Sequence, residues 1–395
     1  MKSITGKLKL LAIAGITLVA AIAIQSCKKS SGPSGPVVTS TTLAAGATVT
    51  AGTSTGFTIT GTNLTSATVT TTATGITVTN VTVNAGGTSI TGTVSVNASV
   101  ASGTITLTIT TSQGTASATF NVTGLPVLGG YVSSDSVAAS NLIAYWPLDA
   151  DVNDHKGGIA GTGVNVTYVT GVRGQAYQGA TNAYASFTPS TAMAGLQSFS
   201  VSVWYWQTAQ PVGTPNTPQG MFFLADANGA DPLIILENEY YAPVSGDSVR
   251  IHAGLVFPAA TNYNYFIMET FDTAAIGKWV HFVMTYNGGT STYVVYQDAV
   301  PMLNSSAYGS NISTVLLQGP AGATPPSLPQ GNIDWSSKPP VQGTIGTWAP
   351  GVFGVSPTLG SNGNWVGKLD ELRLFNVALS QQQVSGLFLN GQAGR

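Results

Sequence analysis

Two glutamates in this chain stand at the spacing that sugar chemistry requires, Glu237 and Glu239. Side chains at positions i and i+2 of a β-strand point to the same side, about 6.5–7 Å apart. Carboxylates at about this separation can act as the paired groups of a glycosidase. Asn238, Tyr240 and Tyr241 surround the pair, and these residue types suit sugar contacts or an edge strand equally. A glycoside-active site at the two glutamates is therefore one hypothesis for the chain.

A second group of side chains offers the oxygen ligands that a hard cation prefers. It comprises Asp149, Asp151, Asn153, Asp154 and, in a later alternating segment, Asp370. Asp370 shares a predicted strand face with Leu372 and Leu374, and a buried carboxylate needs a cation or several N–H donors. Such a density of carboxylates suits Ca²⁺, so a structural calcium site is expected at Asp149, Asp151, Asp154 and Asp370. The alternative is Asx turns at the three earlier aspartates and backbone hydrogen bonds to Asp370.

A long Pro/Gly-rich segment, 304–350, contains Trp335 and Trp348 with Asn332 and Asp334 close by. Aromatic faces stack on sugar rings, and amide and carboxylate groups hydrogen-bond to hydroxyls. Long loops on a sandwich also commonly carry binding sites. The segment therefore predicts a ligand site at these four residues, extended by Tyr240 and Tyr241. The competing interpretation is that both rings fasten the loop to the sandwich.

Other candidate groups lack a pattern that would give them chemistry. Glu371 and Arg373 lie two positions apart on the strand face opposite Asp370, which predicts an exposed ion pair of little energetic value. The histidines His155, His252 and His281 have no metal-ligand spacing. No Gly-x-Ser-x-Gly elbow and no phosphate-binding Gly-rich loop is present, so nucleophilic and nucleotide chemistry are unsupported.

Cys27 is the only cysteine, and it closes an N-terminal segment with the features of an export signal. Lysines precede an apolar run, 10–24, which is too short to span a bilayer comfortably. The junction Ile24-Gln25-Ser26-Cys27 resembles a bacterial lipobox, except that Gln25 replaces the usual small residue. We expect a lipoprotein signal peptide at 1–26, acylation of Cys27 and a flexible tether at 27–36. The alternative is an ordinary cleaved signal with an incidental cysteine.

The charge balance limits the partners of the mature chain. Removing the three lysines of the signal leaves 10 basic against 15 acidic side chains, a formal charge of about −5. This argues against nucleic acid and anionic lipid as ligands. Abundant Gly, Thr, Ser and Val with 7% charged residues favour short strands and tight turns.

The segment 37–122 has no charged residue and alternates apolar residues with Thr or Ser. Runs such as 57–60 and 104–110 place apolar side chains on one face and hydroxyls on the other. Gly- and Asn-rich turns separate these runs, which predicts a small antiparallel sandwich of Ig type. The order of motifs between Phe57 and Gly114 resembles the IPT/TIG family, which implies a spacer next to a lipid anchor.

A linker is expected at 123–140, and all seven tryptophans, all three histidines and every further charge lie beyond Asp135. Within 141–395, segments 199–205 and 280–286 alternate as half-buried strands. Ser380 and Gln383 have capping-box spacing before one terminal helix. The sequence thus predicts an all-β fold: a small Ig-like sandwich, then a larger sandwich with a short C-terminal helix.

Motifs at both ends of this second part carry a family resemblance. The first is Leu142-Ile143-Ala144-Tyr145-Trp146-Pro147-Leu148-Asp149, and the last is Gly367-Lys368-Leu369-Asp370-Glu371-Leu372-Arg373. With Trp279-Val280-His281 between them, 141–395 resembles the LamG-like jelly roll of the concanavalin A-like group. The resemblance implies paired terminal strands and allows a structural calcium. Hydrolases of that group carry a longer Glu-x-Asp-x-Glu type motif, which is absent here.

The resulting interpretation is a non-catalytic, exported lipoprotein at the cell envelope, with the outer membrane facing the exterior as the expected location. Its expected partner is a polysaccharide or glycoconjugate bound by the second domain, and its membrane contact is the lipid anchor. The alternatives are a glycoside-active enzyme using Glu237 and Glu239, and a protein-binding adhesin or structural envelope protein.

Overall fold

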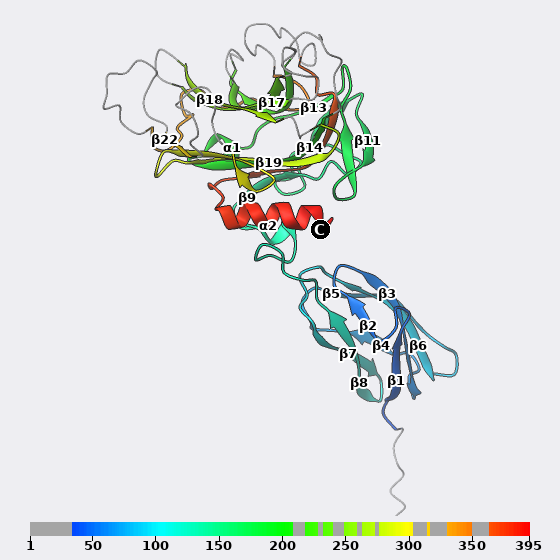
Figure 1. Ribbon diagram of the computed structural model, residues 1–395. Helices are drawn as coiled ribbons and strands as arrows, with labels where there is room; N and C mark the ends of the chain where they lie inside the picture. The colour runs from blue at the N-terminus through cyan, green and yellow to red at the C-terminus, as the bar shows by residue number, and fades with distance from the viewer. Residues whose placement is uncertain are drawn as a thin grey trace, which may run out of the picture.

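The computed structural model describes residues 34–207, 218–227, 232–239, 249–258, 263–272, 276–302, 314–316, 330–349 and 363–395. The chain forms a small β-sandwich followed by a large one that ends in a helix (Figure 1). The predicted all-β fold is confirmed. The predicted signal peptide, 1–26, and Cys27 lie outside the described residues. None of the helices in the described part is both long and apolar enough to cross a bilayer.

Two four-stranded sheets form the small sandwich, in the orders β1-β3-β6-β5 and β2-β8-β7-β4. Their strands are β1 Val37–Leu43, β2 Thr48–Thr50, β3 Ser54–Thr62, β4 Thr68–Thr70, β5 Ile76–Val83, β6 Ser89–Val96, β7 Gly103–Thr111 and β8 Gly114–Thr123. In β3, Phe57 and Ile59 are buried while Thr58 and Thr60 are partly exposed. This alternation places the apolar face inward and the hydroxyls outward. The predicted Ig-like sandwich is therefore present.

Part of the predicted linker, 123–140, packs against the large sandwich. It contains a 3₁₀ turn, η1 (Ser134–Ser136). The amide of Asn390 donates to the carbonyl oxygen of Leu128 at 3.1 Å. The Oγ of Ser134 donates to the carbonyl of Arg395 at 2.8 Å. The second half of this segment thus belongs structurally to the large domain.

The large sandwich consists of two sheets with a helix outside one of them. The seven-stranded sheet has the order β10-β13-β23-β15-β16-β17-β18. Its strands are β10 Thr162–Val164, β13 Tyr184–Phe187, β15 Gln219–Ala225, β16 Pro232–Glu239, β17 Val249–Pro258, β18 Tyr263–Asp272 and β23 Gln342–Ile345. The nine-stranded sheet has the order β11-β12-β24-β14-β19-β20-β21, with β9 beside β24 and β22 beside β20. Its strands are β9 Leu142–Trp146, β11 Thr167–Thr170, β12 Gln175–Gln178, β14 Phe199–Gln207, β19 Trp279–Asn287, β20 Thr292–Gln297, β21 Val300–Pro301, β22 Thr314–Leu316 and β24 Gly367–Phe375.

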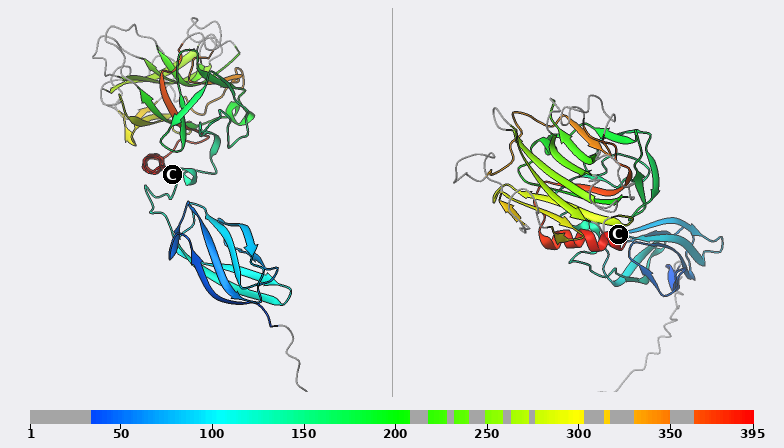
Figure 2. Two further views of the ribbon diagram at one scale, coloured as in Figure 1. Left: turned by 90° about the vertical axis from the view of Figure 1, so that its right-hand side faces the viewer. Right: turned by 45° about the horizontal axis from the view of Figure 1, so that its top comes forward.

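Side-chain alternation on β14 separates two apolar layers. Phe199, Val201, Val203 and Tyr205 lie in the core between the sheets. The intervening residues of β14 point to the outer face of the nine-stranded sheet, where helix α2 (Gln381–Gln392) lies (Figure 2). A short helix, α1 (Thr191–Ala194), precedes β14.

The predicted capping box of α2 is confirmed. Ser380 Oγ accepts from the backbone N–H of Gln383 at 3.3 Å, and the Gln383 side chain accepts from the backbone N–H of Ser380 at 2.8 Å. Val384 and Leu387 are buried in the outer apolar layer beneath the helix. This reciprocal cap stabilises the helix at the point where its apolar face docks.

A bulge in β24 changes which of its side chains face the core. Glu371 has a φ of +53°, and the register against β14 shifts by one residue at this point. Leu369, Leu372 and Leu374 consequently lie in the core between the sheets. Asp370 falls on the outer face, so the expectation that it shares a face with Leu372 and Leu374 is wrong. A bulged residue interrupts the two-residue period of a strand, and the alternation of apolar and polar residues in the sequence does not reveal where this happens.

Candidate functional site

The two tryptophans expected to stack on a ligand are buried. Only 1% of Trp335 and 6% of Trp348 is exposed. The indole N–H of Trp335 donates to the carbonyl of Val256 at 3.1 Å, and that of Trp348 donates to Glu237 Oε2 at 2.7 Å. Neither ring has a free face for a sugar, so the expectation of solvent-facing rings is wrong. The rings fasten the segment 330–349 to the sandwich instead.

Glu237 is enclosed by protein groups. It has no exposed surface, and its Oε1 lies 3.3 Å from Nδ1 of His252 while Trp348 holds the other oxygen. Catalysis by Glu237 stays a prediction. The side chain of Glu239 lies outside the described residues, so the separation of the two carboxylates stays a prediction.

Of the remaining predicted ligand-binding residues, the structure describes two. Asn332 and Asp334 are exposed, and Asp334 accepts the backbone N–H of Ser336 at 2.9 Å. The hydrogen bonds from Ser336 hold the pKa of Asp334 below its usual range. Tyr240 and Tyr241 lie outside the described residues. Ligand binding by these four residues stays a prediction. The two tryptophans that motivated it, Trp335 and Trp348, are buried.

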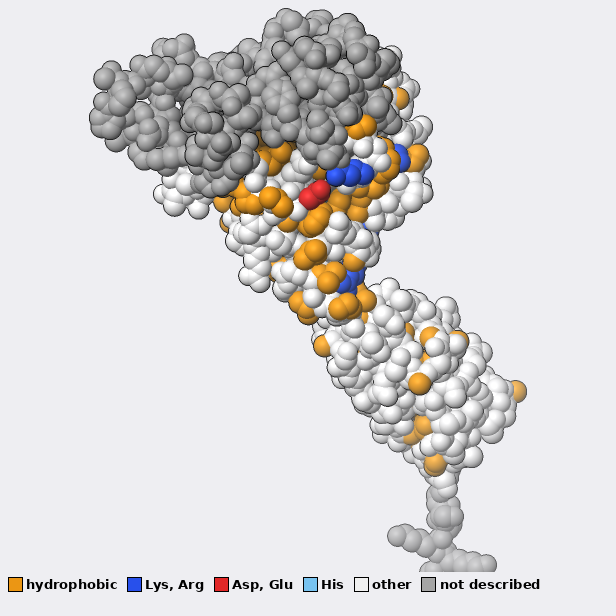
Figure 3. All heavy atoms as spheres, viewed as in Figure 1, with side chains coloured by type: hydrophobic (Ala, Val, Ile, Leu, Met, Phe, Trp, Pro, Cys, Tyr) orange, Lys and Arg blue, Asp and Glu red, His pale blue; other side chains and the backbone are white. Residues whose placement is uncertain are grey.

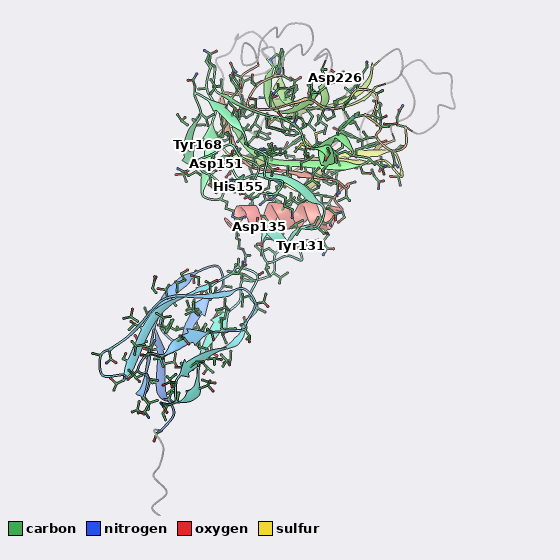
Figure 4. The ribbon with its side chains drawn as sticks, turned by 180° about the vertical axis from the view of Figure 1, so that it is seen from behind. Tyr131, Asp135, Asp151, His155, Tyr168 and Asp226 are labelled. Carbon is green, nitrogen blue, oxygen red and sulfur yellow. The ribbon has the colours of Figure 1, made fainter. Side chains whose placement is uncertain are left out.

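The four predicted metal ligands do not converge on one place. Asp151 forms an exposed ion pair with His155, 3.1 Å apart, on the edge of the large domain that also carries Tyr168 (Figure 4). Asp154 Oδ1 accepts three backbone N–H groups at 2.8–2.9 Å, from Tyr145, Lys156 and Gly157. These two aspartates therefore follow the hydrogen-bonded alternative.

Asp149 and Asp370 lie at the turn between β11 and β12. Asp149 accepts the backbone N–H of Gln175. Oδ2 of Asp370 accepts the N–H groups of Val172 and Arg173 at 2.6 and 3.2 Å. Gly174 has a φ of +68°, and a Cβ there would collide with the Asp149 carboxylate, so glycine is required for the close approach.

Asp370 has one feature that fits a cation. Its Oδ1 is buried without a hydrogen-bond partner. Burial, reinforced by the charge of Glu371, raises the pKa of Asp370 to about 8. Yet no group of three or more His, Cys, Asp or Glu side chains that could hold a metal occurs among the residues that the structure describes. Calcium at Asp149 and Asp370 would need backbone carbonyls as further ligands, and it stays a prediction.

Glu371 and Arg373, expected to form an exposed ion pair, are buried at 1% and 2% exposure. Arg373 Nη2 lies 2.6 Å from Glu371 Oε2 and 3.0 Å from Asp135 Oδ1. The Arg173 guanidinium donates two bonds of 2.7 Å to Asp135, and the Tyr145 hydroxyl donates to Glu371 at 2.5 Å. The expectation was wrong because η1, which carries Asp135 beside α2 (Figure 4), covers this face.

Two successive rows of side chains cross the outer face of the nine-stranded sheet. Strand register pairs Trp204 of β14 with Asp370 of β24 and His281 of β19. We call these three residues the covered row. Trp204 is 3% exposed, and its ring stacks on Phe388 of α2 with centroids 5.8 Å apart. Helix α2 therefore covers Trp204 and His281, whose ring centroid lies 6.1 Å from that of Phe388, and the β11–β12 turn covers Asp370.

The next row lies two residues further along β14. Register pairs Trp206 with Lys368 of β24 and Trp279 of β19, and we call these three residues the open row. All three side chains are partly exposed. The two indoles meet edge to face with centroids 6.0 Å apart. Lys368 Nζ lies 4.6 Å from the Trp206 centroid and 5.8 Å from that of Trp279.

The sequence did not predict that the three residues of the open row lie together. Alternation on β14 places Trp206 on the same face as Trp204, which was a usable signal. The other two members come from strands more than 70 positions away, and only the sheet register brings them together. The described molecule thus presents one partly exposed aromatic and cationic surface, where stacking and hydrogen bonding are both available.

Comparison with known proteins gives a likeness of fold only. No family model and no curated protein matches the chain. Among solved structures, a heptameric SAP-like pentraxin from Limulus polyphemus is 14% identical, with 49% of this chain and 70% of that chain covered and a TM-score of 0.30. The binding domain of botulinum neurotoxin DC in complex with SialylT is 12% identical, with coverage of 63% and 51% and a TM-score of 0.39. Trypanosoma rangeli sialidase in complex with the inhibitor DANA is 14% identical, with coverage of 73% and 42% and a TM-score of 0.40.

Proposed function

We propose that this protein is a non-catalytic lipoprotein of the cell envelope that binds carbohydrate through its large sandwich. The observation that supports this most directly is the open row, where Trp206 lies between Lys368 and Trp279 on a partly exposed sheet face. Indole faces pack against the C–H face of a sugar ring, and an ammonium group donates to its oxygens. The proposal therefore moves the binding site from the loop tryptophans to the outer face of the nine-stranded sheet.

The two resemblances seen in the sequence belong to the same proposal. We assign the large domain to the LamG-like jelly rolls and the small one to the IPT/TIG type. The small sandwich has no charged side chain at 37–122. Its visible surface in Figure 3 is accordingly almost free of charge, whereas basic and apolar groups gather on the large domain. This contrast supports a spacer role for the small sandwich.

The proposal is tested by binding the full chain to a panel of neutral and acidic polysaccharides. Trp206→Ala and Trp279→Ala should each weaken affinity several-fold or more, since aromatic packing contributes about 1 kcal/mol beyond burial. Tyr184→Ala is the matched control, because Tyr184 is a partly exposed aromatic residue of the other sheet. If all three variants bind with the same affinity as wild type, the open row is not part of the binding site.

The same panel separates binding from hydrolysis. If wild type produces new reducing ends from a polysaccharide and the Glu237→Gln variant does not, the protein is a glycoside-active enzyme instead. Capture of a surface protein, with no polysaccharide bound, would favour the adhesin interpretation.

Lipid anchoring rests on the lone Cys27 at the end of the signal, outside the described residues. We expect Cys27→Ser to move the protein from the detergent phase to the aqueous phase after membrane extraction. Unchanged partitioning of that variant would mean that Cys27 carries no lipid.

A further inference from the structure

The open row contains a cation that no carboxylate neutralises. Within the part of the chain that the structure describes, Lys368 Nζ interacts with the rings of Trp206 and Trp279 and forms no ion pair. Asp370 lies two residues further along β24. It is fully buried and accepts backbone N–H groups of the β11–β12 turn. The ammonium of Lys368 is therefore available to a negatively charged ligand.

The position of this ammonium decides what kind of sugar suits the site. It lies over the Trp206 ring, so a sugar must displace it before stacking on that face. A neutral sugar offers the displaced ammonium only hydroxyl oxygens in place of the ring. A carboxylate at the ring edge replaces the cation–π contact with a charge-assisted hydrogen bond, which is stronger and shorter. Displacement of Lys368 from the Trp206 ring is then part of binding. The new hydrogen bond offsets most of the free energy that is lost with the cation–π contact.

We propose that the open row binds a carboxylated sugar, such as a uronic acid residue, with the Trp206 indole under the sugar ring, Trp279 beside it and Lys368 on its carboxylate. The inference rests on the proposed carbohydrate-binding function and narrows it to acidic glycans. The geometry supports one charged sugar at a time, because the row offers one cation, which lies over the Trp206 ring. The competing structural role is that the Lys368 stem shields the indoles from water.

The test compares ligands that differ only in charge. The full chain in detergent is titrated with oligogalacturonate, oligoalginate and oligoglucuronate, and with the methyl ester of each. Wild type should bind at least one acidic oligomer about tenfold or more tightly than its ester, and salt should weaken that binding. Lys368→Gln should lower affinity for the acid to that for the ester, and Lys368→Arg should retain the preference.

Each failure has its own meaning. Equal binding of acid and ester by wild type, or an undiminished preference in Lys368→Gln, overturns the inference while leaving carbohydrate binding intact. Absence of binding to every acidic and neutral oligomer and to the polysaccharide panel overturns the proposed function as well. Thermal unfolding of Lys368→Gln guards against misfolding, and a matching melting temperature is expected because Lys368 is partly exposed. If Lys368→Gln unfolds, the comparison of acid and ester in Lys368→Arg and wild type still decides the outcome.

Discussion

The covered row and the open row differ in environment far more than in composition. Each has a tryptophan of β14 at its centre, with a charged type on β24 and an aromatic type on β19. In the covered row, burial raises the pKa of Asp370 to about 8, and burial with the charge of Arg373 lowers the pKa of His281 to about 3. Both groups are then neutral near pH 7, whereas Lys368 in the open row is partly exposed. The comparison teaches that α2 converts one half of this sheet face into core and leaves the other half partly exposed.

The largest expected effect comes from removing the central tryptophan of each row. Trp204→Ala should destabilise the large domain by about 3–5 kcal/mol, because the buried ring leaves a cavity under α2. Trp206→Ala should cost about 1 kcal/mol or less, since its ring is partly exposed. Urea unfolding followed by tryptophan fluorescence reports on the large domain alone, as all seven tryptophans lie there. If both variants lose the same free energy of unfolding, the two rows do not differ in burial as described.

The contrast between the two rows also shows which structural features could be predicted from the sequence. Alternation along β14 and the capping box of α2 were sufficient to predict the core face of the strand and the terminal helix, but β14 was expected to be half-buried and is buried on both faces beneath α2. Both features are local, with residues of one element setting their own faces. The bulge at Glu371 was not predictable, because a φ of +53° on a glutamate leaves no mark on the pattern. Its consequence was the wrong face for Asp370.

The candidate site was less predictable than the fold, for a physical reason. Trp335 and Trp348 lie in a segment rich in Pro and Gly, and composition favours exposure there. Their rings are buried because the carbonyl of Val256 and the carboxylate of Glu237 accept their N–H groups. Those partners come from other strands, so only tertiary structure decides between a staple and a ligand site.

A second expected effect is a pH dependence that belongs to the covered row. The pKa of His281 is lowered to about 3 by burial first and by the charge of Arg373 second. Between that value and the unfolded value of about 6.5, the unfolded chain binds the extra proton, so stability falls as pH falls. The contribution of His281 to this loss should reach about 2 kcal/mol at pH 5, at about 1.4 kcal/mol per pH unit. The raised pKa of Asp370 acts in the opposite direction over the same range, so the contribution of His281 is measured as a difference between variants.

His281→Gln isolates this contribution. A glutamine amide can still hydrogen-bond to Ser202 Oγ, which lies 2.9 Å from Nε2 of His281. Urea unfolding of the variant between pH 7 and pH 5 should therefore lack this part of the acid loss. A wild-type curve no steeper than that of the variant would mean that His281 takes up a proton within the fold.

The smallest expected effect concerns calcium in the covered row. Oδ1 of Asp370 is buried without a hydrogen-bond partner beside the turn that also holds Asp149, and a bound cation would supply its missing partner. Extracellular calcium modules bind at about 10⁻⁴–10⁻³ M, so millimolar calcium exceeds such a dissociation constant by about one- to tenfold. Mass action then gives about 1 kcal/mol of stabilisation, or a shift of about 2–4 °C in melting temperature for a domain of this size. EDTA should produce that shift in wild type, and Asp370→Asn should abolish it, while Asp151→Asn serves as control because Asp151 pairs with His155 on the exposed edge. A melting curve unchanged by EDTA would leave Asp370 as a protonated carboxyl held by the backbone of Val172 and Arg173, and the covered row would then be a structural element without a metal.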